Sequence, residues 1–446
     1  MEINYSKIYF IGIGGIGMSS IALYYLNNKK FVGGYDKIKT ELTLKLSKTG
    51  AQIHYESDLS NIPKEFKDKS NTLIIYTPAI SKDNIELNYF IENGYNVLKR
   101  SEALGIISQN KFCIAIAGTH GKTTTSTILS HLLYDNNINF TSFIGGISEN
   151  YNSNLIENGQ DIILVEADEF DRSFLTLSPN IACITSIDSD HLDIYHTGNE
   201  LEKSFKEFAN NIKKDGVLFN SYDLPFNGIS YGISSNAQFS IKNYRIEDDY
   251  VFFDIKYNNG ICKNIRFEMP GMHNVCNALA AFAICKNLKI KDDDLVKSFK
   301  TFKGVKRRFS YVLKSPKILI DDYAHHPKEI QAIYDSVNSL YPNKKIMAVF
   351  QPHLFSRTRD FMNEFANELS KFNEIVLMKI YPARENPING IDSSALLNKI
   401  NSNNKKLLER RDLISHIVKS KAEVIVVMGA GDISNEVDKI KNAILN

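Results

Sequence analysis

The sequence has few cysteines, no long apolar run and no excess of charge of one sign. Its five cysteines are scattered without the C-x-x-C spacing of a zinc site, so we expect reduced thiols and neither a zinc site nor a disulfide framework. The longest apolar stretches, such as 424–428, have strand length and fall far short of the roughly 20 residues that span a bilayer. A net charge of +2 gives no reason to expect nucleic acid or an anionic membrane as a partner.

The chain is too long for one ordinary core. Its 446 residues, divided by about 150 residues per domain, suggest three domains. The N-terminus carries an acidic Glu2 and lacks the basic and apolar regions of a signal peptide, so we expect a cytoplasmic protein. Strand and helix patterns alternate throughout, which predicts α/β domains over 1–108, 109–311 and 312–446. The oligomeric state stays open between monomer and dimer.

The first block begins as a nucleotide-binding βαβ unit. A predicted strand, Lys7–Ile11, runs into Gly12-Ile-Gly-Gly-Ile-Gly17 and then into an apolar helix, Met18–Leu26. We call 12–17 the glycine loop. Its G-x-G-x-x-G spacing suits a diphosphate, and Asp36, about twenty residues further on, suits ribose hydroxyls. Taken alone, this pattern would equally favour an NAD-dependent dehydrogenase.

The second block begins with a phosphate-binding sequence, Gly118-Thr-His-Gly-Lys-Thr-Thr-Thr125, which we call the phosphate loop. It follows an apolar strand, Phe112–Ala117, and precedes a predicted helix, Ser126–Tyr134. Glycines let backbone N–H groups surround phosphate oxygens, Lys122 supplies a cation, and the Thr123 hydroxyl suits magnesium. The alternative is an ordinary glycine turn with a surface lysine. Hydride transfer needs no triphosphate, so this loop argues against a dehydrogenase.

Acidic residues follow two later strands of the second block. Glu166-Ala-Asp-Glu169 comes after the strand 162–165, and Asp188-Ser-Asp-His-Leu-Asp193 comes after 181–184. Neighbouring parallel strands end at the same crevice, so Glu166 and His191 are expected near the phosphate loop as metal ligands. His191 as a solvent-exposed helix cap is the alternative.

The later parts of the chain change character and then return to the α/β pattern. Apolar and polar residues alternate from Gln238 to Met269, as 250–257 and 264–269 show, and Asn258-Asn-Gly260 supplies a turn, so we expect an antiparallel hairpin beside the main sheet. Further strands are expected at 317–320, 346–350, 374–377 and 424–428.

These motifs together resemble those of the Mur ligases, over nearly the whole chain. The resemblance is carried by the phosphate loop and by Glu166-Ala-Asp-Glu-Phe-Asp171, Asp190-His-Leu-Asp193, His273-Asn-Val-Cys-Asn277 and Arg307-Arg-Phe309. Within that family, the glycine loop, Asp321-Asp-Tyr-Ala-His-His-Pro327 and Phe350-Gln-Pro-His353 look like those of members that attach L-alanine to UDP-N-acetylmuramate.

The resemblance implies an N-terminal Rossmann-like UDP-binding domain, a central P-loop ATPase-type domain with a parallel or mixed sheet, and a C-terminal Rossmann-like domain. It implies that ATP phosphorylates the muramyl carboxylate and that an amine attacks the acyl phosphate. Gly14, Gly15 and Gly17 would hold the UDP diphosphate, with Asp36 near the uridine. ATP would be bound by Gly118, Thr119, His120, Gly121, Lys122, Thr123, Thr124, Asn277, Arg308 and Asp322.

The resemblance also assigns roles in catalysis, metal binding and amine binding. Lys122, His191 and Arg308 would be catalytic, and Thr123, Glu166 and His191 would hold magnesium. The amino acid would be bound by His325, His326, His353 and Arg357, although His325 and His326 could instead be turn residues before Pro327.

The chain departs from relatives at two positions. Leu354 stands where some relatives carry an arginine, so Arg357 is the candidate for the amino-acid carboxylate, which a guanidinium can bind with two parallel hydrogen bonds. Lys206 falls by count where several Mur ligases have a carbamylated lysine, but it lies in a charged amphipathic helix pattern, and we read it as solvated.

Two other functions compete with the alanine ligase. One is a recycling ligase that attaches a whole tripeptide to the same muramyl substrate. The other is a nucleotide-dependent regulatory or scaffold protein without catalysis, which loss of Lys122, Glu166 or His191 would have signalled; all three are present.

Overall fold

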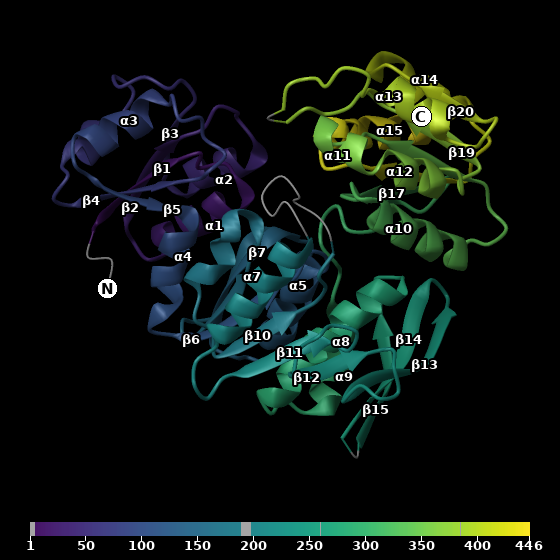
Figure 1. The fold of residues 1–446 in the computed structure, drawn as a ribbon, viewed down its shortest axis with the longest axis horizontal. Coiled ribbons are helices and arrows are strands. Elements are labelled where there is room, and N and C mark those ends of the chain that lie inside the picture. The colour runs from purple at the N-terminus through teal and green to yellow at the C-terminus, as the bar shows by residue number, and fades with distance from the viewer. Residues whose placement is uncertain (1–4, 189–197, 259, 384) are drawn as a thin grey trace. The chain divides into compact units, whose positions relative to one another are not determined.

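A computed structural model describes residues 5–188, 198–258, 260–383 and 385–446, which form three β-sheets with accompanying helices (Figure 1). Contacts group the chain into two compact units. The first comprises Met1–Tyr244, Phe253–Arg266 and Cys276–Phe302, and the second comprises Arg245–Phe252, Phe267–Val275 and Lys303–Asn446.

The N-terminal sheet is fully parallel, with strand order β3-β2-β1-β4-β5. The strand predicted at Lys7–Ile11 is confirmed as β1, and the predicted helix is α1, which begins two residues before its predicted start. The elements are β1 (Lys7–Ile11), α1 (Ile16–Asn27), β2 (Phe31–Tyr35), α2 (Glu41–Thr49), β3 (Gln52–His54), η1 (Lys64–Lys67), β4 (Thr72–Tyr76), α3 (Ile85–Glu92), β5 (Asn96–Lys99) and α4 (Arg100–Gln109).

The central sheet is mixed, as the resemblance implied, with order β15-β14-β13-β12-β11-β10-β6-β9-β7-β8. Its elements are β6 (Phe112–Ala117), α5 (Lys122–Asp135), β7 (Phe140–Ser148), β8 (Ser153–Glu157), β9 (Ile162–Glu166), η2 (Phe170–Thr176), β10 (Ile181–Ile184), α7 (Gly198–Asn210), β11 (Val217–Ser221), β12 (Ile229–Gly232), β13 (Phe239–Glu247), β14 (Tyr250–Tyr257), β15 (Gly260–Phe267), α8 (Met272–Asn287) and α9 (Asp292–Thr301).

Strand β6, which precedes the phosphate loop, lies between β10 and β9 and is parallel to both. The loops that follow these three strands therefore meet at one edge of the sheet. The predicted bounds of β6 and β10 are confirmed. The predicted hairpin is also present, but β14 and β15 continue the main sheet through β13 and do not form a separate layer beside it.

The third sheet has order β16-β17-β21-β18-β19-β20, and only the β16–β17 pair is antiparallel. All four strands expected from the sequence are found. The elements are β16 (Ser310–Leu313), β17 (Ile318–Asp322), α10 (Pro327–Leu340), β18 (Ile346–Phe350), α11 (Phe355–Asp360), α12 (Met362–Leu369), β19 (Glu374–Leu377), α13 (Ser393–Lys399), β20 (Lys405–Leu407), α14 (Arg410–Lys419), β21 (Val424–Met428), η3 (Asp432–Glu436) and α15 (Val437–Leu445).

Two expectations from composition can be compared with the structure. None of the described helices is both long and apolar enough to cross a membrane. The five cysteines all lie among the described residues and form no disulfide. Burial raises the pKa of the Cys113 and Cys183 thiols to about 12, so both remain protonated and unreactive at neutral pH.

The N-terminal and central sheets of the first unit share one hydrophobic core. Helix α1 packs against β7 and β8 as well as against its own sheet. Buried residues of β1 and α1, such as Phe10 and Met18, belong to the same cluster as Phe174 of η2. The ring of Phe174 stacks on Phe208 at 5.1 Å and meets Phe205 edge-on at 5.1 Å. Because the apolar surfaces are buried together, the glycine loop is fixed relative to the central sheet.

We expect Phe174→Ala to lower the free energy of unfolding of the first unit by about 3–5 kcal/mol, because the substitution leaves a cavity among fully buried rings. Urea denaturation followed by circular dichroism measures the change. Ile91→Ala is the control, since Ile91 is 55% exposed on α3 and should have almost no effect. Equal losses for the two variants would contradict the shared core.

Candidate active site

The phosphate loop is held by the chain that follows β10. The N–H of Thr119 donates to the carbonyl of Ser186 at 3.0 Å, and the N–H of His120 donates to the Ser186 hydroxyl at 2.8 Å. The Asp188 N–H donates to the Thr119 hydroxyl at 3.0 Å. The His120 ring lies 3.6 Å from the carboxylate of Asp188. These bonds fix the loop before any phosphate binds.

Two glycines of the phosphate loop have no space for a side chain. Gly118 has φ +135° and Gly121 has φ +83°, which favour glycine. A Cβ at Gly118 would collide with Thr185, and one at Gly121 would collide with the amide of Asn277. Asn277, expected at the adenine, thus packs directly behind the loop and also accepts a hydrogen bond from the Thr125 hydroxyl at 3.3 Å.

Lys122 begins α5, four residues before the predicted start of this helix. Its ammonium donates to Glu169 at 2.7 Å and to the carbonyls of Gly118 at 2.6 Å and Thr119 at 3.3 Å. Burial by itself lowers the pKa of Lys122, but the carboxylates of Glu169, Asp168 and Glu166 outweigh it and raise the pKa. Lys122 is therefore a permanent cation at neutral pH.

Glu166 joins the phosphate loop to β7. Its carboxylate accepts from the Thr123 hydroxyl at 2.9 Å and from the Gly145 N–H at 2.7 Å. A hydroxyl beside a carboxylate is a pair of hard oxygen donors, which fits magnesium. No cluster of three metal-binding side chains occurs within the described part of the chain. His191, the third expected ligand, lies outside the described residues.

Asp36, which the resemblance places near the uridine, contacts the glycine loop itself. Asp36 accepts from the N–H of Gly14 at 2.8 Å and from that of Ile38 at 3.0 Å, so its carboxylate closes the loop onto the end of β2. A Cβ at Gly14 would press on Asp36 and Thr43. Gly14 is therefore required for loop packing, whatever Asp36 does toward a ligand.

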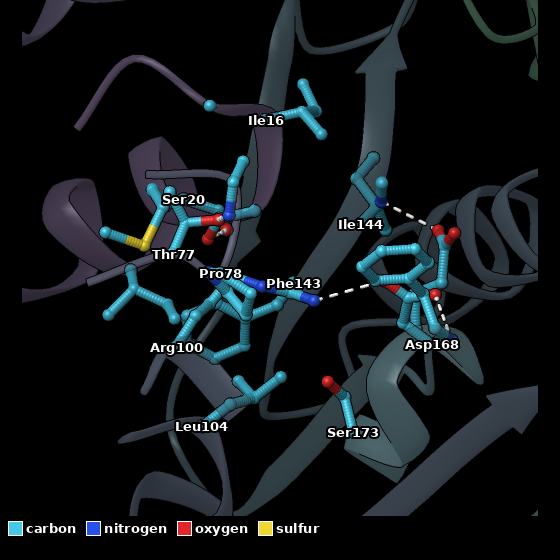
Figure 2. A pocket seen from close by; sticks show the side chains of 18 residues that line it. Ile16, Ser20, Thr77, Pro78, Arg100, Leu104, Phe143, Ile144, Asp168 and Ser173 are labelled. Atoms are coloured by element: carbon cyan, nitrogen blue, oxygen red, sulfur yellow. Dashed lines mark hydrogen bonds and ion pairs between the residues drawn. The ribbon is translucent and has the colours of Figure 1, made fainter. Parts of the chain in front are cut away.

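A cavity of about 330 Å³ extends from the glycine loop to Glu166 (Figure 2). Gly15 and Gly17 line one part of it, while Gly14 and Asp36 do not. Other lining residues come from the loop after β4, from α4, from β7, from the end of β9 and from the segment after it: Thr77, Pro78, Arg100, Leu104, Phe143, Gly145, Glu166, Asp168 and Ser173. One end thus suits a diphosphate, and the other end reaches the carboxylate beside the phosphate loop.

In the second unit, Asp322 is buried at the end of β17. Its carboxylate accepts from the N–H of Phe309 at 2.6 Å and from that of Ala324 at 2.7 Å. Arg308 lies 3.7 Å from Glu329 and stacks on the Tyr323 ring. Both residues expected to bind ATP in this unit thus lie close together at the carboxyl end of β17, although β16 and most of β17 separate them in the sequence.

The four residues expected to bind the amino acid fall into different environments. The rings of His325 and His353 meet edge-on at 5.9 Å, and the His353 ring stacks on Tyr381 at 5.7 Å. His326 is buried and caps α10, where its ring nitrogen accepts from the Lys328 N–H. This geometry favours the turn-residue alternative for His326. Arg357 is 7% exposed on α11, which begins two residues after His353.

Arg100 was not singled out from the sequence, and Asp168 and Glu169 were noted in the acidic motif after β9 without a role of their own. Arg100 lies in the cavity and pairs with Asp168 at 3.1 Å, and Glu169 is the partner of Lys122. Arg100 follows a strand of the N-terminal sheet, which is the signal that could have identified it. Its partner lies 68 residues further along the chain, which no local pattern indicates.

Comparison with known proteins agrees with this geometry. Three family models match successive segments: "Mur ligase family, catalytic domain" over 7–112, "Mur ligase middle domain" over 116–285, and "Mur ligase, glutamate ligase domain" over 307–431. The UDP-N-acetylmuramate–L-alanine ligase of Christiangramia forsetii is 51% identical, with 100% of this chain and 99% of the relative covered.

Solved structures give the same result for the fold. The UDP-N-acetylmuramate–alanine ligase of Thermotoga maritima is similar with a TM-score of 0.83 and 27% identity, covering 98% of each chain. The murein peptide ligase of Psychrobacter arcticus has a TM-score of 0.71 at 20% identity, covering 99% of each chain, which shows a common fold alone. The fold and the phosphate loop define a nucleotide-dependent α/β ligase. Over its whole length, the chain belongs to the Mur ligase family.

The Asp322 carboxyl gives the site a pH dependence that can be measured. Burial raises its pKa from 3.8 to about 7, against the lowering effect of Arg308. The folded chain therefore keeps this proton where the unfolded chain has lost it, so the stabilising contribution is full below the unfolded pKa and is lost as pH rises through about 7. We expect Asp322→Asn to flatten the fall in melting temperature between about pH 4 and pH 7. An unchanged slope would assign the pH dependence to other groups.

Proposed function

We propose that the protein ligates L-alanine to the lactoyl carboxylate of UDP-N-acetylmuramate, forming UDP-N-acetylmuramoyl-L-alanine, ADP and phosphate in peptidoglycan precursor synthesis. The observation that carries the proposal is the cavity between the glycine loop and Glu166, because it connects a diphosphate-binding loop with the carboxylate beside the phosphate loop. The identity of 51% to a ligase of that name over the full chain supports the same substrates.

The chemistry would proceed in two balanced steps. A carboxylate oxygen of the substrate attacks the γ-phosphorus of ATP, the bond to the bridging oxygen breaks, and ADP leaves. The alanine amine then attacks the carbonyl carbon of the acyl phosphate, the bond to the phosphate oxygen breaks, phosphate leaves, and the amine proton passes to water. The two steps make amide formation easier, because phosphate leaves the carbonyl carbon far more readily than a carboxylate oxygen would.

The residues of the first unit would stabilise the transferred phosphoryl group. Lys122 would neutralise negative charge on the β and γ phosphates, and the loop amides at the start of α5 would bind their oxygens. Thr123, Glu166 and His191 would hold magnesium, which when bound draws charge from the phosphate oxygens. Asn277 would contact adenine.

The residues of the second unit would contact ATP and the amino acid. Arg308 would contact the γ-phosphate and Asp322 the ribose of ATP. His325, His353 and Arg357 would bind alanine, with the guanidinium on its carboxylate. We propose the domain boundaries as 1–108, 109–311 and 312–446, and a cytoplasmic location, since its proposed substrates are intracellular precursors.

We expect ATP-dependent phosphate release with UDP-N-acetylmuramate to be stimulated by L-alanine, with a product one alanyl residue heavier by mass spectrometry. Discrimination by a single methyl is worth only about 1–3 kcal/mol in an apolar pocket, so some product with glycine or serine is expected. L-Ala-D-Glu-meso-diaminopimelate is the comparison amine. Preference for this tripeptide would assign the protein to recycling, and no release with either amine would refute the proposed substrate.

We expect Lys122→Ala to lower kcat by at least about 10²- to 10³-fold without weakening UDP-N-acetylmuramate binding, because the lysine acts on transferred phosphate and does not line the cavity. Phosphate release and isothermal titration calorimetry measure the two quantities. Lys206→Ala is the matched control: this lysine is 55% exposed and pairs with Glu202 within α7. Equal loss of turnover and of UDP-substrate binding in Lys122→Ala would contradict separate phosphate sites.

A further inference from the structure

The segment 166–171, which we call the acidic segment, makes ion pairs with both parts of the first unit. Glu169 pairs with Lys122 at 2.7 Å, Asp168 with Arg100 at 3.1 Å, and Asp171 with Lys99 at 3.0 Å. Lys122 belongs to the phosphate loop, whereas Lys99 and Arg100 lie at the junction of β5 and α4. One short stretch of chain thus contacts a cation of the phosphate loop and a cation that lies against the glycine loop.

The pairing of Lys122 uses every donor of its ammonium group. An ammonium has three N–H donors, and those of Lys122 bond Glu169, the Gly118 carbonyl and the Thr119 carbonyl. Glu169 is the only anion among these three acceptors, and it is 1% exposed. A phosphate oxygen can approach Lys122 as an acceptor only if one of these bonds is given up, and Glu169 is the one that a second anion would repel.

Arg100 is likewise a cation whose carboxylate partner, Asp168, lies where a substrate anion would bind. Its guanidinium reaches across the cavity toward Asp168 (Figure 2). It also lies against the glycine loop, because a Cβ on Gly17 would come within 2.7 Å of its Nη1. The side chains of Arg100 and Asp168 are 21% and 36% exposed, so an entering anion can reach the pair. A guanidinium beside a diphosphate loop suits an anionic oxygen of the substrate.

The backbone after Asp168 is in an unfavourable conformation. Asp171 and Arg172 both have φ +53°, and two successive left-handed residues other than glycine are uncommon. Such a conformation persists only where surrounding contacts impose it, and it is found in segments that change position. The ion pairs of Asp168 and Glu169 are contacts of that kind.

We propose that the acidic segment couples the two substrate sites of the first unit, an inference that rests on the proposed function. In the substrate-free chain, Asp168 and Glu169 occupy Arg100 and Lys122. An anionic group of the UDP substrate displaces Asp168 from Arg100, and the phosphates of ATP displace Glu169 from Lys122. Because the two carboxylates belong to adjacent residues, release of one lowers the free energy needed to release the other. Arg100 is thus a substrate-binding residue, and each substrate strengthens binding of the other.

Calorimetric titration tests the coupling without turnover. UDP-N-acetylmuramate and the non-hydrolysable analogue AMP-PNP with magnesium are each titrated alone and with the other at saturation. We expect each to raise the affinity of the other by the same factor, between about 5- and 150-fold, since coupling of binding is reciprocal. A factor of one in the unsubstituted protein would overturn the proposal.

Asp168→Asn separates this coupling from the proposed substrate. Asparagine keeps the acceptor that binds the Phe170 N–H but removes the charge that holds Arg100. We expect Asp168→Asn to raise AMP-PNP affinity about fivefold in the absence of any UDP substrate, and the coupling factor to fall toward one. Asp171→Asn is the matched control, because it removes an exposed ion pair from the same segment and should leave both quantities unchanged.

The outcomes are distinguishable. Unchanged AMP-PNP affinity in Asp168→Asn, or the same increase in Asp171→Asn, would overturn the coupling. Weaker binding of UDP-N-acetylmuramate to Asp168→Asn would also overturn it, since Asp168 would then hold Arg100 in the bound state. Failure of the unsubstituted protein to bind UDP-N-acetylmuramate would refute the proposed substrate, while the AMP-PNP comparison would still decide the coupling.

Discussion

The two hydrogen bonds of the Glu166 carboxylate are the interaction on which the site depends. One oxygen accepts from Thr123 at the start of α5, and the other accepts from the Gly145 N–H in β7. Gly145 is glycine for a steric reason, because a Cβ there would collide with the carboxylate. The end of β9 is thereby held at the point where the phosphate loop and the cavity meet. Every feature of the site in the first unit is positioned relative to that point.

The shared hydrophobic core fixes the distance between the two loops. Domains joined by a polar interface can move relative to one another. If the N-terminal and central sheets were joined in that way, the glycine loop could move relative to the phosphate loop. Instead α1 packs directly against β7 and β8, and Asn154 of β8 donates to the Ile16 carbonyl at 2.6 Å. The strand that carries Gly145 therefore also supports the helix that follows the glycine loop.

The sequence predicted the strands and loops well because their signals are local. The bounds of β1, β6 and β10 follow from short apolar runs that end at glycine or polar residues. The start of α5 was placed too late because Lys122 and the threonines after it were interpreted as loop, although a phosphate loop ends within the first turn of its helix. The hairpin was recognised, but its place in the sheet depends on pairing with β13, which has no local signal.

Only those residues of the candidate site that stand in a sequence motif could be predicted. Lys122, Thr123 and Glu166 were found because each stands at a fixed place in a strand-loop-helix pattern. The motif that contains Asp168 and Glu169 was noted as well, but their pairing with Arg100 and Lys122 could not be predicted, because the partners lie 68 and 47 residues apart and are brought together by packing of separate elements. Asp36 and His326 illustrate a related limit, since their residue types suit both a ligand and a backbone amide.

The shared core has a consequence for how such a chain can be recombined. A chimera joined at the end of α4 would receive an N-terminal sheet whose inner face was shaped against another protein's β7, β8 and η2. Matching substrate loops would not restore the stability of such a chimera, because core rings such as Phe174 and Phe205 would pack against side chains of the wrong volume. A chimera that is meant to change substrate specificity should therefore exchange the first two sheets together.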